Sequence, residues 1–223
     1  MREISVLGVS LIDRSLREAM KLLGELLETE SLGTVCFLSN ELLIKAKDDT
    51  DLRDAIQGMD LPVAASVEIL EAGGIKSVSR LREVEGNYFI KEMLKKLARE
   101  KKKIFLIGNS QDELVTLRET LLSVAGKLTF FGSFAYDGPE TSQDAVINAI
   151  NTIIPDVIIS AASSPEQEHL MHNSRNMVNS RVWISLQPEV LKKLGDRKRG
   201  GFLSDIIDRL IFKRTLRNFD DKG

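Results

Sequence analysis

The sequence predicts an α/β fold: a mostly parallel sheet with helices on both faces, followed by a basic helical appendage at the C-terminus. Short apolar runs alternate with amphipathic stretches of about 8–15 residues, which is typical of parallel strands joined by crossover helices. Two stretches begin with serine followed three positions later by glutamate, a helix-capping pattern. Residues 192–223 hold ten Lys/Arg and five Asp/Glu. This end therefore carries +5 and the rest −7, within a net charge of −2.

In the first half of the chain, apolar residues at 4–9 indicate a short strand. Ser15 and Glu18 then form a capping box for an amphipathic helix that ends near Glu28. The elements expected next are a strand at 34–38, helices at 41–47 and 51–58, a strand at 61–64, a helix at 66–72 and a long helix at 86–100.

The second half continues the alternation. A strand at 104–107 leads to Gly108, and Ser110 with Glu113 forms a second capping box. The elements expected after this helix are a strand at 128–131, a loop with Tyr136 and Asp137, a helix through Ile153, a strand at 157–160, a helix that opens with Pro165 and a last strand at 182–186. The parallel arrangement is therefore predicted to be Rossmann-like.

Residues 155–171 hold the main candidate for a functional site. A buried strand runs into a turn of small residues, and Pro165 suits the first turn of the next helix because it lacks an N–H group. Gln167 and Glu168 follow at the carboxyl end of the strand, which is where open α/β sheets bind ligands. The alternative is an ordinary strand–turn–helix unit without a ligand.

Composition limits the class of protein. A chain of 223 residues fits one domain, expected at 1–195, and an appendage at 196–223. The net charge argues against a general nucleic-acid binder, and the single Cys36, expected to be buried, excludes an internal disulfide and a cysteine zinc site. No signal peptide is recognised, and no apolar run approaches the roughly 18 residues of a membrane span. We expect a cytoplasmic protein.

Two histidines and the tryptophan have ordinary structural interpretations. His169 and His172 have the i, i+3 spacing that two metal ligands on a helix would have, but no third ligand converges on them. A surface or partly buried pair is the favoured interpretation, and neither a metal nor a cofactor is expected. Trp183 on the last strand is expected in the core.

The C-terminal appendage resembles a basic amphipathic helix. An apolar stripe is formed by Leu203, Ile206, Ile207 and Leu210. Arg209, Lys213 and Arg217 form a row at i, i+4 and i+8, with Arg214 beside it. Such a helix can lie on an anionic membrane surface, or it can dock on the body with its basic face in solvent. Both interpretations stay open.

Several short motifs follow one another along the chain in a characteristic order. They are Asp13 to Glu18, Ser39-Asn40, Ala46-Lys47-Asp48-Asp49 with Asp51-Leu52-Arg53, Val84-x-Gly86, the strand ending at Gly108, and Pro155-Asp156 with Pro165-x-Gln167-Glu168. In this order, from Ile4 to Arg217, the chain resembles the WecG/TagA/CpsF glycosyltransferase family. Arg209, Arg214 and Arg217 are similar to the family's membrane-associating appendage.

The resemblance implies an inverting transferase that needs no metal. Such enzymes move N-acetylmannosamine, or a related sugar, from a UDP-sugar to undecaprenyl-diphosphate-linked N-acetylglucosamine, for wall teichoic acid or surface polysaccharide. The reaction needs a base for the acceptor hydroxyl and a cation or dipole for the departing diphosphate. The substrate-binding residues implied for this chain are Asn40, Arg82, Gly108, Tyr136, Gln167 and Glu168.

At the position where the family has its catalytic base, this chain has a residue that cannot act as a base. The family has an aspartate where this chain has Ala65, and a methyl group cannot accept a proton. Loss of a positioned base costs about 10²–10⁴ in rate. Glu68 is the nearest acid, but its place three residues along a helix is expected to turn it in a different direction. The sequence therefore offers no intact catalytic residue.

Other positions of the family's site also differ. Glu83 stands where an arginine is expected, with Arg82 beside it, and a carboxylate there would repel a diphosphate. Asn40 comes one place late after its strand, and Leu191 replaces an aspartate. The scaffold signals survive while polar site residues are lost together, which is the pattern of a degenerate transferase.

Three functional hypotheses follow. In the favoured one, the chain is catalytically impaired or non-catalytic and binds UDP or a UDP-sugar, an undecaprenyl-diphosphate-linked saccharide, or an active paralogue. Alternatively it is an active transferase with a relocated base, Glu68 or Asp137. The third is a scaffold at the inner face of the cell membrane, bound through its basic tail. A homo-oligomer fits each of them, and no nucleic-acid partner is expected.

Overall fold

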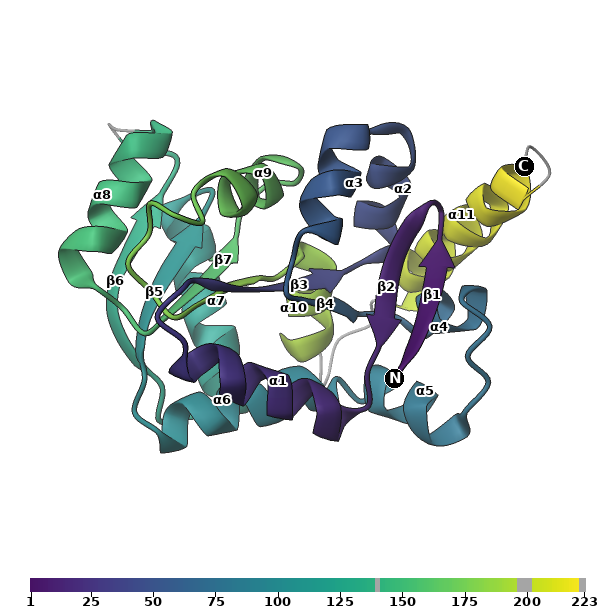
Figure 1. Ribbon diagram of the computed structural model, residues 1–223, viewed down its shortest axis with the longest axis horizontal. Helices are drawn as coiled ribbons and strands as arrows, with labels where there is room; N and C mark the ends of the chain where they lie inside the picture. The colour runs from purple at the N-terminus through teal and green to yellow at the C-terminus, as the bar shows by residue number, and fades with distance from the viewer. Residues whose placement is uncertain (139–140, 196–201, 221–223) are drawn as a thin grey trace.

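A parallel sheet forms the centre of the molecule (Figure 1). The computed structural model describes residues 1–138, 141–195 and 202–220. Within these residues the main sheet has six strands in the order β4-β3-β8-β7-β5-β6, and every neighbouring pair is parallel. The strands are β3 (Gly33–Leu38), β4 (Leu61–Ala64), β5 (Lys103–Gly108), β6 (Thr129–Ala135), β7 (Val157–Ala161) and β8 (Val182–Ser185). The predicted α/β fold class is confirmed.

Helices cover both faces of the sheet, as predicted. Successive strand residues point to opposite faces, so Ile158 joins one core cluster while Val157 and Ile159 join the other. Trp183 and Cys36 are fully buried in the first cluster. The helices on that face are α2 (Asn40–Asp48), α3 (Thr50–Gln57), α8 (Gln143–Ile153) and α9 (Glu166–Asn173). The helices on the opposite face are α1 (Leu16–Glu28), α6 (Tyr88–Arg99), α7 (Gln111–Val124) and α10 (Pro188–Gly195).

One of the two predicted capping boxes forms completely. The Ser15 N–H donates to Glu18 Oε2 at 2.9 Å, and the Glu18 N–H donates to Ser15 Oγ at 3.4 Å. At α7, Ser110 Oγ accepts from the Glu113 N–H at 3.2 Å, but the Glu113 carboxylate accepts instead from the Asn109 amide at 2.8 Å. The second box is therefore only half formed, because Asn109 competes for the carboxylate.

The single strand expected at residues 4–9 is wrong. The structure has an antiparallel hairpin of β1 (Arg2–Val6) and β2 (Val9–Asp13), separate from the main sheet. Leu7 and Gly8 connect the strands with φ angles of 52° and 80°. Positive φ at both positions makes the tight two-residue turn that suits the twist of a hairpin.

The long helix expected at 86–100 is confirmed as α6. A separate helix, α5 (Val78–Glu85), directly precedes it. The Gly86 N–H donates to Arg82 O at 2.9 Å and ends α5, and Asn87 then has a left-handed φ of 51°. A Cβ atom at Gly86 would lie 2.2 Å from the Tyr88 ring, so this break requires glycine. Neither α5 nor α10 was expected from the sequence, whereas α4 (Val67–Ala72) was.

The C-terminal helix α11 (Phe202–Asp220) docks on the body against α2 and α4. Phe212 is fully buried in the core and Leu216 packs beside it. The predicted boundary between 195 and 196 falls where α10 ends, and residues 196–201 lie outside the described part of the chain. Among the residues described, no helix has the length and apolarity needed to cross a membrane.

Candidate functional site

The carboxyl ends of the strands gather the polar side chains that can bind a ligand. Because β4, β3, β8 and β7 are successive neighbours, the segments that follow them lie side by side at one edge of the sheet. These segments contribute Ala65 and Ser66, Ser39 and Asn40, Gln187, and Ser163 and Ser164.

Two cavities adjoin at this edge. The first, here called the α11 cavity, has a volume of about 300 Å³, and its lining includes Asn40, Ala65, Ser66, Glu68, Lys193 and Arg209. The second, called the α9 cavity, has about 230 Å³, and its lining includes Lys45, Asn109, Ser163, Ser164 and Gln187. Glu41 and Glu189 line both cavities and mark their junction.

An ion pair joins α11 to the wall of the α11 cavity. Arg209 Nε lies 2.9 Å from Glu68 Oε1, and the Glu68 residue is only 7% exposed. Nearby, Ser66 Oγ donates to Asn40 Oδ1 at 2.6 Å. Glu68 therefore lines the same cavity as Ala65, and the expectation that its helix turns it away from position 65 is wrong. The reason is that α4 begins directly after Ser66, so its first turn borders the cavity.

A pair of carboxyl groups lies at the junction of the cavities. The side chains of Glu41 and Glu189 are hydrogen bonded, and Lys45 Nζ lies 3.0 Å from Glu41 Oε1. The hydrogen bond with Glu189, aided by Lys45, lowers the pKa of Glu41. Burial, aided by the hydrogen bond with Glu41, raises the pKa of Glu189. The two groups therefore hold one proton between them more readily than two isolated glutamates would.

Gln167 and Glu168 lie beneath the cavities and line neither of them. Gln167 is 2% exposed and its Oε1 accepts from Ser160 Oγ at 3.0 Å. Gln187 Nε2 donates to Glu168 Oε1 at 2.9 Å. Glu168 is fully buried, and burial raises its pKa to about 7. Both side chains thus support the cavity wall through Gln187 and Ser164 instead of facing a ligand.

Three predicted site residues line neither of these cavities. Gly108 is the last residue of β5, Tyr136 follows β6, and the Tyr136 N–H donates to Gly108 O at 3.1 Å. Burial raises the pKa of the Tyr136 hydroxyl. Arg82 is exposed on α5. None of the three lines the α11 cavity or the α9 cavity, so the structure does not bring them together with Asn40.

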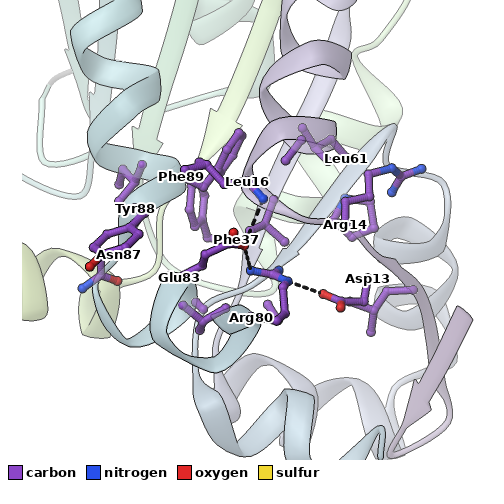
Figure 2. Close-up of a pocket in the computed structure, with 18 of the residues that line it drawn as sticks. Asp13, Arg14, Leu16, Phe37, Leu61, Arg80, Glu83, Asn87, Tyr88 and Phe89 are labelled. Carbon is purple, nitrogen blue, oxygen red and sulfur yellow. Dashed lines mark hydrogen bonds and ion pairs between the residues drawn. The ribbon is translucent and has the colours of Figure 1, made fainter. Parts of the chain in front are cut away.

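Ala65 also lines a third cavity, of about 30 Å³, whose lining includes Asp13, Arg80 and Glu83 (Figure 2). Arg80 spans it, with Nε 2.9 Å from Asp13 Oδ1 and Nη1 3.2 Å from Glu83 Oε2. The same Glu83 oxygen accepts from the Leu16 N–H at 3.0 Å and so satisfies the start of α1. Glu83 is therefore a structural residue here, paired with a cation that was not recognised from the sequence.

Leu191, which stands where the family resemblance implies an aspartate, lies on α10. It packs against the core cluster on the α1 face of the sheet. Its side chain therefore contributes to packing and not to the cavities, whose described lining does not include it.

The outer face of α11 combines apolar and basic side chains. Ile207 and Leu210 are 55% and 62% exposed. Lys213, Arg214 and Arg217 are exposed on the same helix. The side chains of Leu203 and Ile206, which belong to the predicted stripe, lie outside the described part. Docking uses Phe212 and Leu216 instead, which leaves the exposed side chains available to a partner or surface.

No metal centre is found in the described part of the chain, where no group of three or more His, Cys, Asp or Glu residues has suitable geometry. His169 is half-buried and His172 is exposed on α9. The residues that sequence reasoning missed are Glu41, Lys45, Gln187 and Glu189. The signal for Glu189 was its place directly after Pro188, a residue that favours the first helical position.

A family model described as Glycosyl transferase WecG/TagA/CpsF family matches residues 4–187. No curated protein matches the chain. The matched region contains the whole parallel sheet and the cavity-lining residues up to Gln187. Helices α10 and α11, which supply the remaining lining residues of the cavities, lie beyond it.

Proposed function

The chain belongs to the WecG/TagA/CpsF glycosyltransferase family, and from this premise we propose a specific role for its cavities. They bind a UDP-sugar, with UDP-N-acetylmannosamine as the reference donor, and an undecaprenyl-diphosphate-linked N-acetylglucosamine. The pathway served is the synthesis of wall teichoic acid or another surface polysaccharide. Transfer by this chain is catalytically impaired.

The observation that carries this proposal is the pair of adjoining cavities at the carboxyl edge of the sheet. Their lining residues follow the ends of β4, β3, β8 and β7, the edge where α/β proteins bind nucleotides. Lys45 lines the α9 cavity, with its Nζ 3.2 Å from Ser164 O. It is the cation best placed to meet a diphosphate there.

Impairment is inferred from the chemistry of position 65. Ala65 lines the α11 cavity with a methyl group, so the position that carries the base in the family cannot accept a proton. The rate that a positioned base contributes is about 10²–10⁴-fold. A protein that keeps the cavities without this base can still bind the ligands of the family.

A second candidate is an active transferase that uses Glu68 as its base. The supporting observation is that Glu68 lines the same cavity as Ala65. Its carboxylate is already paired with Arg209, with Nε 2.9 Å from Oε1, and would have to leave this ion pair to reach an acceptor hydroxyl. Replacing Glu68 by Gln would abolish turnover on this hypothesis and leave it unchanged on the favoured one.

The outer face of α11 supports a location at an anionic membrane surface. Exposed apolar side chains next to exposed lysine and arginine are the combination that binds the interface of such a membrane. A lipid-linked acceptor would then be presented close to the α11 cavity, since Arg209 and Ile211 of the same helix line it.

Ligand binding can be tested by thermal unfolding with UDP and with UDP-N-acetylmannosamine. A ligand that binds only the folded state at 100 times its Kd adds about 2.7 kcal/mol. For a chain of this size we expect a rise in Tm of about 5–10 °C. Lys45→Ala should reduce the rise, whereas Lys95→Ala, a change on the exposed side of α6, should not. Absence of any shift at millimolar ligand would contradict the proposed function.

A further inference from the structure

The carboxyl groups of Glu41 and Glu189 lie together at the junction of the two cavities. Glu41 is the second residue of α2, which follows β3, and Glu189 is the second residue of α10, which follows β8. Since β3 and β8 are paired neighbours, the two helices start next to each other and bring the side chains together. A contact between such distant parts of the sequence is specified by the sheet order.

We propose that Glu189, held against Glu41, is the proton acceptor for the transfer that remains to this chain, in place of the carboxylate that position 65 lacks. This inference rests on the proposed function, because it needs a sugar donor and an acceptor in the cavities. It assigns the residual activity of an impaired transferase to a residue on the opposite wall of the same cavity.

The positions of the two walls support this assignment. Ala65 follows β4 and Glu189 follows β8, and β3 lies between these strands. Two strand spacings correspond to about 10 Å. Both residues line the α11 cavity of about 300 Å³. An acceptor sugar bound there therefore has position 65 on one side and Glu189 on the other.

The surroundings of Glu189 suit a base. Glu189 lines both cavities, so its carboxyl group borders the space that a ligand hydroxyl would occupy. Lys45 stabilises the charge of Glu41, the other member of the pair. Because burial raises the pKa of Glu189, its ionised form accepts a proton more readily than an ordinary glutamate does.

The other acids of the α11 cavity are less suitable. Glu68 is held by Arg209, and Asp208 lies on α11 as an exposed residue. The charged groups that face the pair or line its two cavities are Lys45 on α2, Glu68 on α4, Lys192 and Lys193 on α10, and Asp208 and Arg209 on α11. Lys45 and Lys192 favour the ionised form of Glu41.

In the proposed reaction, Glu189 accepts the proton that the acceptor hydroxyl loses as the new glycosidic bond forms. The hydroxyl oxygen of the acceptor sugar forms a bond to the anomeric carbon of the donor, on the face opposite the diphosphate. The bond between that carbon and the diphosphate oxygen breaks, and its electron pair leaves with UDP. The hydroxyl proton passes to the Glu189 carboxylate and is later released to solvent. No metal or further reactant takes part in this sequence.

The test measures acceptor-dependent release of UDP from UDP-N-acetylmannosamine by the full chain, with a lipid-diphosphate-linked N-acetylglucosamine as acceptor. Glu189→Gln should lower the rate at least about tenfold, because an amide of the same shape cannot accept the proton. The UDP-induced rise in Tm should persist, which shows that the variant folds and binds. Glu119→Gln, on the exposed side of α7, is the matched control and should keep the rate.

Two further readouts separate a base from a structural residue. The rate of the unaltered protein should fall as the pH is lowered through the raised pKa of Glu189, and the residual rate of Glu189→Gln should lose this dependence. Adding Ala65→Asp to Glu189→Gln should restore at least part of the rate, since it returns a carboxylate to the cavity.

Three results would overturn the inference. One is an unchanged rate in Glu189→Gln, and another is a double variant no faster than the single one. The third is no acceptor-dependent UDP release from the unaltered protein while UDP still raises its Tm, in which case ligand binding stands and only the role of Glu189 fails. If UDP also leaves the Tm unchanged, the proposed function fails with it.

Discussion

At the scale of single residues, Glu168 is the clearest case of a side chain whose role follows from its surroundings. It is fully buried, one of its oxygens accepts from Gln187, and the other has no partner among the described residues. A carboxylate in this position is costly to ionise, so burial raises its pKa from an ordinary 4.5 to about 7. Its role is structural, because it holds Gln187, which lines the α9 cavity.

This shift predicts a pH dependence of stability. Because the folded-state pKa is raised, the contribution of Glu168 is fully present below about pH 4.5 and is lost as the pH rises to about 7. The loss is on the order of 3 kcal/mol. Glu168→Gln should therefore have a higher free energy of unfolding than the unaltered chain at pH 8 and a similar one at pH 4.5. Urea unfolding at both pH values would measure this, and an equal difference at both would contradict it.

At the scale of elements, α11 packs on the body with one face and exposes the other face to solvent. Phe212 is buried in the core, and Arg209 forms an ion pair with Glu68. The apolar and basic side chains on the outer face of the helix remain exposed. The apolar periodicity of a helix is therefore not sufficient to tell which side docks. Here part of the stripe recognised in the sequence, Ile207 and Leu210, faces outward.

Membrane association through α11 can be tested without deleting the helix. Changing Lys213, Arg214 and Arg217 together to Gln removes three exposed charges, each worth about 1 kcal/mol near an anionic surface. We expect co-sedimentation with phosphatidylserine-containing vesicles to fall at least about tenfold. The control changes Lys21, Lys95 and Lys127 to Gln, which removes the same charge from exposed sites elsewhere. Equal loss in both triple variants would show that only net charge matters.

At the scale of the whole molecule, the order of the strands decides which residues can act together. The strand β4, which leads to Ala65, and β6, which leads to Asp137, lie at opposite edges of the sheet. Five strand spacings separate them, which is about 24 Å. Asp137 also accepts from the Gln111 N–H at 3.3 Å, at the start of α7.

Asp137 was one of the two relocated bases considered from the sequence, and the strand order makes a direct prediction for it. Asp137→Asn should leave the acceptor-dependent release of UDP within about twofold of the unaltered rate, because the carboxylate is too far from the α11 cavity to accept the proton. A loss comparable to that expected for Glu189→Gln would mean that the reaction takes place at the β6 edge.

The sequence by itself determined most of the local structure of this protein. The capped start of α1, the buried strands and the covered faces of the sheet follow from patterns of short-range periodicity. The family follows from the order of the motifs along the chain, and the match over residues 4–187 shows it. The error at residues 4–9 arose where Leu7 and Gly8, both with positive φ, reverse the chain, which apolar periodicity does not register.

Only the tertiary structure decided which side chains share a site. Glu41 and Glu189 meet because β3 pairs with β8, and Gln167 turns inward because Ser160 and Ser164 bond its amide. Pairing between distant strands and the packing of α11 depend on contacts across the whole fold, which no local pattern specifies. The sequence therefore pointed to Ala65, where the family resemblance implies a base, and the fold brings Glu41 and Glu189 to the same cavity.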